Sequence, residues 1–115
     1  MSDTLALLLT AKAAGIEEPP TPGTAGALFL LGLGTAAAEM VDDYRETNEH
    51  DQFVEHAGLA VVNVLPTAVK WQVWTDLRLW QQEDEPNLTS LDALVDGALS
   101  TVAARIAEWI WDGGV

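Results

Sequence analysis

Four carboxylates recur at helical spacing near the middle of the chain. They are Glu39, Asp42, Asp43 and Glu46. The pattern i, i+3, i+4 and i+7 puts them on one face of a helix, where like charges repel each other at a small local cost. Carboxylates grouped in this way can hold a divalent cation such as Mg²⁺, or they can form a docking face for a basic protein surface. A face that is simply solvated is the plainest interpretation.

This region partly resembles the all-α NTP pyrophosphatases. That family binds Mg²⁺ with acidic pairs on two successive helices, an E-x-x-E motif followed by E-x-x-D. Within residues 34–65, Glu39 corresponds to the last acid of the first motif and Glu55 to the first acid of the second. A threonine and an alanine stand in place of the earlier acids, and Gly58 stands in place of the final aspartate. The resemblance implies a metal-dependent nucleotide hydrolase that has lost part of its ligand set. The candidate metal ligands are Glu39, Asp43 and Glu55.

The two histidines, His50 and His56, are six residues apart and do not share a helical face. Glu46 and His50 are four residues apart, which suits a surface ion pair. The chain has no cysteine, which excludes disulfides, cysteine-ligated zinc and a thiol nucleophile. Because the two histidines do not share a helical face, a structural role is favoured over a catalytic one for both of them.

Tryptophan is frequent, with five residues in 115. Trp111 lies opposite the apolar stripe of the last predicted helix, and Trp71 lies off the apolar face of its own segment. Both are expected to be exposed in an isolated monomer, and exposed tryptophans are enriched at binding hot spots. The sequence therefore predicts a partner contact at these two residues, or a weak homodimer through Trp111 that tightens as salt screens the charge. The alternative is that Trp71 meets another helix of the same chain, or that Trp111 folds over a frayed helix end.

The charge and composition of the chain limit the classes of molecule that it can bind. With 5 lysines and arginines against 18 aspartates and glutamates, the net charge is −13, which repels nucleic acid and anionic lipid and favours basic proteins. The first apolar run follows Asp3 and lacks the positive charge that precedes it in a secretory signal. The uncharged stretch of residues 25–38 is shorter than the roughly 20 residues of a membrane span. We therefore expect a cytoplasmic protein without direct nucleic-acid or membrane binding.

The acidic stripe and the tryptophans must be positioned mainly by helices, because helical periodicity runs through most of the chain. Breaks at residues 15–24 and 83–87 separate the segments. Helices are expected over residues 4–14, 24–48, 51–65, 66–83 and 91–112. Alternating apolar residues leave a β-hairpin within residues 59–80 as an alternative. The sequence thus predicts one all-α domain over residues 1–115, a bundle of four to five helices, or an α+β fold with this hairpin.

Three functions follow as hypotheses. The first is a small non-enzymatic interaction protein that binds a basic surface, comparable by charge and size with antitoxins, immunity proteins and phage inhibitors, including those that mimic DNA. Its partner-binding residues are Glu39, Asp42, Asp43, Glu46, Glu49, Trp71 and Trp111. The second is the Mg²⁺-dependent hydrolase, and the third is a structural or assembly subunit. The first hypothesis needs no cofactor. Acidic side chains that point outward would favour it, whereas acidic side chains that converge in a pocket would favour the hydrolase.

Overall fold

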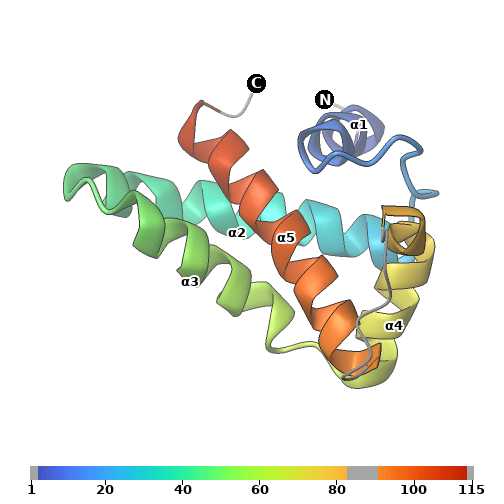
Figure 1. The fold of residues 1–115 in the computed structure, drawn as a ribbon. Helices are drawn as coiled ribbons and strands as arrows, with labels where there is room; N and C mark the ends of the chain where they lie inside the picture. The colour runs from blue at the N-terminus through green and yellow to red at the C-terminus, as the bar shows by residue number, and fades with distance from the viewer. Residues whose placement is uncertain (1–2, 83–90, 114–115) are drawn as a thin grey trace.

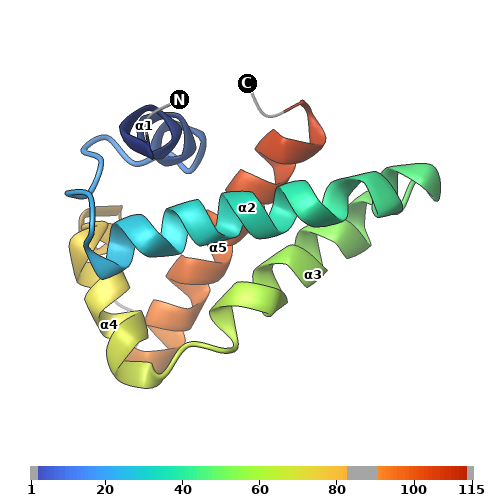
Figure 2. The ribbon, with the colours of Figure 1, turned by 180° about the vertical axis from the view of Figure 1, so that it is seen from behind.

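The fold is all α-helical. The computed structural model describes residues 3–82 and 91–113, and in them the chain forms five α-helices and one 3₁₀ turn, with no strand. The elements are α1 (Asp3–Ala13), α2 (Ala25–Glu46), α3 (His50–Val62), α4 (Thr67–Asp76), η1 (Leu79–Gln82) and α5 (Leu91–Trp111). Figures 1 and 2 show α2 crossing the molecule, with α3 and α5 packed on it and α1 and α4 beside its first half. The predicted helical bundle is confirmed. The predicted break at residues 83–87 lies outside the described residues.

The alternative hairpin at residues 59–80 is wrong, because this region forms two helices. Helix α3 ends at Val62, and α4 begins after Pro66, which is its N-cap with φ −60° and ψ 151°. A proline at a helix start sacrifices no hydrogen bond, since the first N–H groups of a helix have no intrahelical acceptor. Of the alternating apolar residues that suggested a strand, Val73 is buried in α4, and Val69 and Trp71 on the same helix pack against the core.

The core has two parts. The first cluster joins α1, the first half of α2, α4 and α5, and its largest fully buried side chains include Leu30, Leu33, Val73, Leu99 and Ile106. The second cluster lies at the other end of α2, where Ala37, Val41, Phe53, Ala57 and Ala107 are buried. Phe53 is the one large side chain among the buried members of the second cluster. The acidic half of α2 therefore rests on a much smaller core than the apolar half.

Helix α2 begins where a close approach to α4 satisfies its first N–H groups. The Thr24 side chain accepts from the Ala27 N–H, and Asp76 at the end of α4 accepts from the Gly26 N–H at 2.9 Å. A Cβ on Gly26 would lie 2.6 Å from the Asp76 Cβ, so this contact requires glycine. The sequence suggests the same use for Gly32, but nothing lies within 4 Å of a Cβ there.

Helix α1 packs through Leu7 and Ala11, while three of its other leucines face solvent. Leu7, Ala11 and Ala14 are buried, whereas the helically spaced leucines 5, 8 and 9 remain exposed. The helix ends in a Schellman motif, in which Gly15 has φ +79° and the Ile16 N–H donates to the Ala11 carbonyl at 2.9 Å. This turn buries Ile16 and sends the following loop past η1 (Figures 1 and 2).

By length and composition, α2 is the one helix among the described residues that could cross a membrane. Seven of its residues are buried in the structure: Gly26, Ala27, Phe29, Leu30, Leu33, Ala37 and Val41. The core helix of a soluble protein has the same composition, so the fold is compatible with a soluble protein.

Candidate interaction surface

The four helically spaced carboxylates lie on the solvent side of the second half of α2. Glu39, Asp42, Asp43 and Glu46 are all exposed, and we call them the acidic face. The opposite side of the same turns carries Val41, which is buried, and Met40 and Tyr44, which pack against the second cluster. Glu49, the fifth predicted acid, is half-buried as the N-cap of α3 and makes no side-chain capping hydrogen bond. The acidic face therefore points outward.

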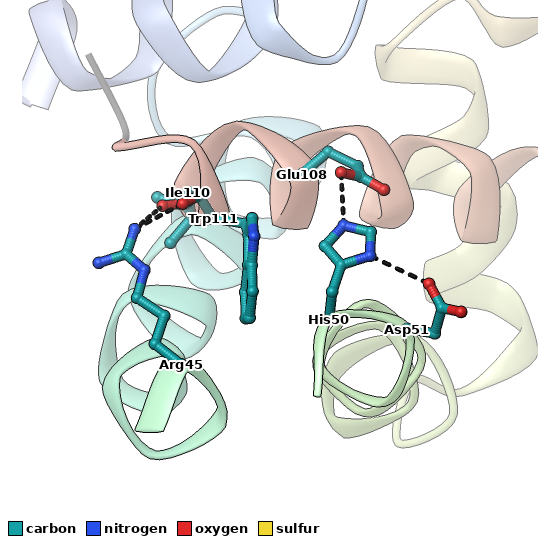
Figure 3. Close-up of polar contacts among 6 residues, drawn as sticks. All are labelled: Arg45, His50, Asp51, Glu108, Ile110 and Trp111. Atoms are coloured by element: carbon teal, nitrogen blue, oxygen red, sulfur yellow. Dashed lines mark hydrogen bonds and ion pairs between the residues drawn. The ribbon is translucent and has the colours of Figure 1, made fainter. Parts of the chain in front are cut away.

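A tight turn positions the residues that follow the acidic face. Asn48 has φ +56°, a left-handed conformation that asparagine tolerates better than most residues. The Asn48 N–H donates to the Arg45 carbonyl at 3.1 Å, and the Glu49 N–H donates to the Tyr44 carbonyl at 2.9 Å, which completes a Schellman motif. This turn places Arg45, in the last turn of α2, and His50, the first residue of α3, beside the end of α5 (Figure 3).

Arg45 ties the end of α2 to the end of α5. Its Nη2 donates to the carbonyl oxygens of Ile110 at 3.0 Å and Trp111 at 2.6 Å (Figure 3). The last carbonyls of a helix have no intrahelical donor and carry the negative end of the helix dipole, so a guanidinium is favoured there. Asp42 lies 3.8 Å from the other Nη atom in an exposed pair, which contributes little to stability. The hydrogen bonds of Arg45 therefore go to α5 rather than to the acidic face.

His50 lies between two carboxylates. Its Nε2 is 2.7 Å from Glu108 Oε2 on α5, and its Nδ1 is 3.0 Å from Asp51 Oδ1 (Figure 3). The hydrogen bond to Glu108, followed by that to Asp51, raises the pKa of His50 above its ordinary value of 6.5, because both ring nitrogens then donate to an anion. The sequence spacing suggested Glu46 as the partner. The structure instead pairs His50 with Glu108, 58 residues away.

Trp111 fills the space between these two polar contacts. Figure 3 shows its ring between Arg45 and His50. The ring meets the His50 ring edge-on with centroids 5.1 Å apart, and it lies 5.6 Å from the Phe53 ring. We call Arg45, His50, Glu108 and Trp111 the C-terminal clamp, because together they hold the end of α5 against α2 and α3.

The expectation that Trp71 and Trp111 are exposed is wrong, since both are half-buried. Trp71 packs against the first cluster, and its Nε1 donates to Asp92 at 2.8 Å. Trp111 is covered because α5 has two buried sides, one toward each cluster, whereas the sequence pattern revealed only the longer one. The exposed aromatic surface on which the homodimer prediction rested is therefore occupied within the chain. Trp80 in η1 is the tryptophan with a large exposed fraction, 49%.

Four of the five basic residues contact distant parts of the same chain. Besides Arg45, Lys70 on α4 pairs with Asp96 on α5 at 2.8 Å, and Arg78 pairs with Glu18 at 2.6 Å. Arg105 on α5 donates to the Ala14 carbonyl at the end of α1 at 3.1 Å. Among the described residues, Arg45 is the one base with an ion pair to the acidic face. The negative charge of that face is thus left largely uncompensated.

The candidate metal ligands Glu39, Asp43 and Glu55 do not form a site. Within residues 3–82 and 91–113, no three histidine or acidic side chains are grouped so that they could hold a metal ion. At His50, the two neighbouring carboxylates approach opposite ring nitrogens and do not face a common point. The donor geometry therefore gives no specific support to the hydrolase hypothesis.

Sequence reasoning missed the C-terminal clamp. The only sequence signal for Arg45 is that it is the single base in an acidic segment, and Glu108 has none beyond its place opposite the core stripe of α5. Comparison with protein-family models, curated proteins and solved structures finds no match for this chain.

Proposed function

We propose that this chain binds a basic protein surface through its acidic face. The observation that carries the proposal is the placement of the bases. Arg45, Lys70, Arg78 and Arg105 are engaged in contacts within the fold, while the four carboxylates of the acidic face point into solvent. A basic partner would therefore meet a concentrated negative charge in which, among the described residues, the exposed Asp42–Arg45 contact at 3.8 Å is the one internal ion pair. Such complementarity increases association rates and selects against other partners.

The density of charge on the acidic face indicates the kind of basic surface. Glu39 and Glu46 are seven residues apart, which is about 10 Å along a helix at 1.5 Å per residue. Four carboxylates over that length give about one charge per 3.5 Å, which is close to the roughly 3.4 Å between phosphates along one strand of DNA. This density favours a partner whose basic surface normally binds nucleic acid. Inhibitors that mimic DNA bind partners of this kind.

The C-terminal clamp supports the proposal by limiting the motion of α2 where it binds. Arg45 fixes the last turn of α2 to α5, and Val41 anchors the inner side of the same turns in the second cluster. A helix that is already ordered loses less conformational freedom on binding than a flexible acidic tail. The clamp therefore preorganises the carboxylates for a partner.

The test compares two variants of equal charge. Asp43→Asn/Glu46→Gln removes two charges from the acidic face and leaves the Asp42–Arg45 pair intact. Glu17→Gln/Glu55→Gln removes two exposed charges elsewhere. Each tagged protein is used to capture partners from host lysate, and each captured protein is then purified and its affinity measured at low and high salt, with and without double-stranded DNA.

The proposal predicts a partner that binds wild type and the control equally, binds the acidic-face variant at least about tenfold more weakly, and is displaced by DNA. Equal binding of that partner by both variants would place the interaction elsewhere on the surface. Binding that is insensitive to salt would show that the acidic charges do not carry it.

A further inference from the structure

Helix α1 carries exposed leucines on the side that faces away from the core. Leu5, Leu8 and Leu9 are 45%, 47% and 38% exposed, and Lys12, seven residues after Leu5, continues the same face. We call these four residues the outer face of α1. The opposite side of the helix packs into the first cluster. A helix that is apolar on both sides is normally covered on both, so the outer face indicates a contact beyond this chain's own core.

The outer face is the one place in residues 3–82 and 91–113 where several large exposed apolar side chains share one side of a helix. The others stand apart on different segments: Leu28 on α2, Leu59 on α3, Val64 before α4 and Trp80 in η1. Single exposed apolar residues are ordinary on soluble proteins, whereas a contiguous patch marks a contact surface.

An open hollow borders the outer face and has a volume of about 560 Å³. It is lined by Leu8, Leu9, Lys12, Gly15, Ile16, Glu17 and Pro19. Leu5 is exposed on the same face one turn before Leu8 and does not line this hollow. The surface thus offers a projecting leucine and an apolar recess side by side. A second copy related by a two-fold axis matches such a surface, because each copy supplies both halves of the contact.

Charge also favours a second copy as the occupant. Residues 3–16 contain one acid, Asp3, and one base, Lys12, and so carry no net charge in a chain of net charge −13. The charged lining of the hollow is balanced as well, with Lys12 and Glu17. Two copies that meet here therefore avoid the repulsion of their acidic surfaces. A basic partner would find no carboxylate on the outer face, and a lipid surface is bound by helices with several lysines or arginines rather than one.

We propose that two copies of this chain associate through the outer face of α1, with the two helices antiparallel about an axis between Leu8 and Leu9. Leu5 of each copy then enters the hollow of the other beside Lys12, whose alkyl stem covers apolar surface while its amine stays in water. The two amines remain about 10 Å apart, since seven residues separate positions 5 and 12. One face of an 11-residue helix is smaller than the roughly 800 Å² per partner of a standard interface, so the dimer is weak.

Sedimentation equilibrium of the full chain, from about 10 µM to about 1 mM, tests the proposal in 0.1 M and 1 M NaCl. A monomer–dimer equilibrium is expected that tightens with salt, because the screening length falls from about 10 Å to about 3 Å. Leu8→Gln keeps a good helix former and weakens association at least about tenfold, since the buried leucine is lost from both copies. The matched control is Leu59→Gln, equally exposed on α3, which lies on the other side of α2 from α1 (Figures 1 and 2). It leaves association unchanged.

Cross-linking tests the position of the axis. The chain has no cysteine, so a single introduced cysteine forms a protein–protein disulfide only with a second copy. In a glutathione redox buffer, Leu9→Cys gives the covalent dimer at least about tenfold faster than Leu59→Cys, because a disulfide needs Cα atoms within about 7 Å. Circular dichroism confirms the fold of each variant.

Three results would overturn the proposal. They are a chain that stays monomeric at about 1 mM in 1 M NaCl, equal association by Leu8→Gln and Leu59→Gln, and equal cross-linking rates of the two cysteine variants. Flotation with phosphatidylcholine vesicles separates the remaining occupant, since a monomer that floats with them would assign the outer face to a membrane surface instead. The dimer is independent of the acidic face, so Asp43→Asn/Glu46→Gln still dimerises whether or not it binds a basic partner.

Discussion

Residues 27–33 of α2 lie among apolar side chains contributed by α1, α4 and α5, whereas residues 37–46 lie on a smaller cluster with charged groups around it. In the first region, Leu30 and Leu33 are almost completely buried. In the second, Ala37 and Val41 are the buried residues on α2 itself, and Phe53 supplies the one large buried side chain. Arg45 and His50 supplement this core with contacts to the end of α5.

The two halves of α2 therefore differ in what they do: the first half stabilises the fold, and the second half presents the acidic face to solvent. Burial of large apolar groups is insensitive to pH and salt, so the first region should hold the fold under any mild condition. Hydrogen bonds that involve charged groups respond to both, so the second region should be the less stable end of the molecule. The acidic face lies at that end, so pH and salt should change the stability of the helices around it.

The largest expected effect comes from Phe53→Ala. Truncating a fully buried phenylalanine costs about 3–5 kcal/mol, and Phe53 is the one large side chain among the fully buried members of the second cluster. Amide hydrogen exchange should show lost protection in α3 and in the last turns of α5, while residues around Leu30 keep theirs. Uniform loss of protection throughout the chain would mean that the two regions do not differ in local stability.

Leu30→Ala should act on the whole molecule. Leu30 is fully buried in the first cluster, and its truncation should lower the free energy of unfolding by about 3 kcal/mol. Urea denaturation followed by circular dichroism and by tryptophan fluorescence should give coincident transitions. Leu28→Ala is the matched control, because Leu28 is 62% exposed and should change stability little.

Arg45→Gln tests the clamp and should cost about 1 kcal/mol, since it removes a charge and two hydrogen bonds at the end of α5. Thermal denaturation measures the loss. Arg45→Lys keeps the charge and should recover part of it. If the glutamine variant is as stable as wild type, the clamp does not hold α5.

His50 should make this end of the molecule sensitive to pH. Because contacts with Glu108 and Asp51 raise its pKa in the folded state, its contribution is complete below about pH 6.5 and is lost as pH rises through the folded-state pKa. The melting temperature of wild type relative to His50→Gln should therefore fall between pH 6 and pH 8. NMR titration of the His50 ring supplies the pKa, and a value below 6.5 would contradict the geometry.

Local sequence signals predicted the elements but not the contacts between them. The all-α fold follows from periodicity, and the starts of α2 and α4 follow from Thr24 and Pro66. The acidic face also follows from spacing alone. The clamp could not be predicted, because Arg45 meets carbonyl groups 65 and 66 residues away, and backbone acceptors have no sequence signature.

The smallest expected effect on stability concerns the acidic face. Asp43→Asn/Glu46→Gln removes repulsion with Glu39 and Asp42, which lie four residues before them, at the negative end of the α2 dipole. We expect a gain of about 0.5–1 kcal/mol at low salt that largely disappears in 1 M salt, where the screening length is about 3 Å. Glu17→Gln/Glu55→Gln, with the same net charge, should gain less. Urea denaturation at both salt concentrations measures the difference.

If the acidic-face variant becomes more stable and no longer binds its basic partner, these carboxylates serve binding rather than stability. Substitutions that stabilise a protein commonly weaken the site they change. A variant that becomes less stable would instead show that these carboxylates support the fold, and the docking proposal would lose its basis.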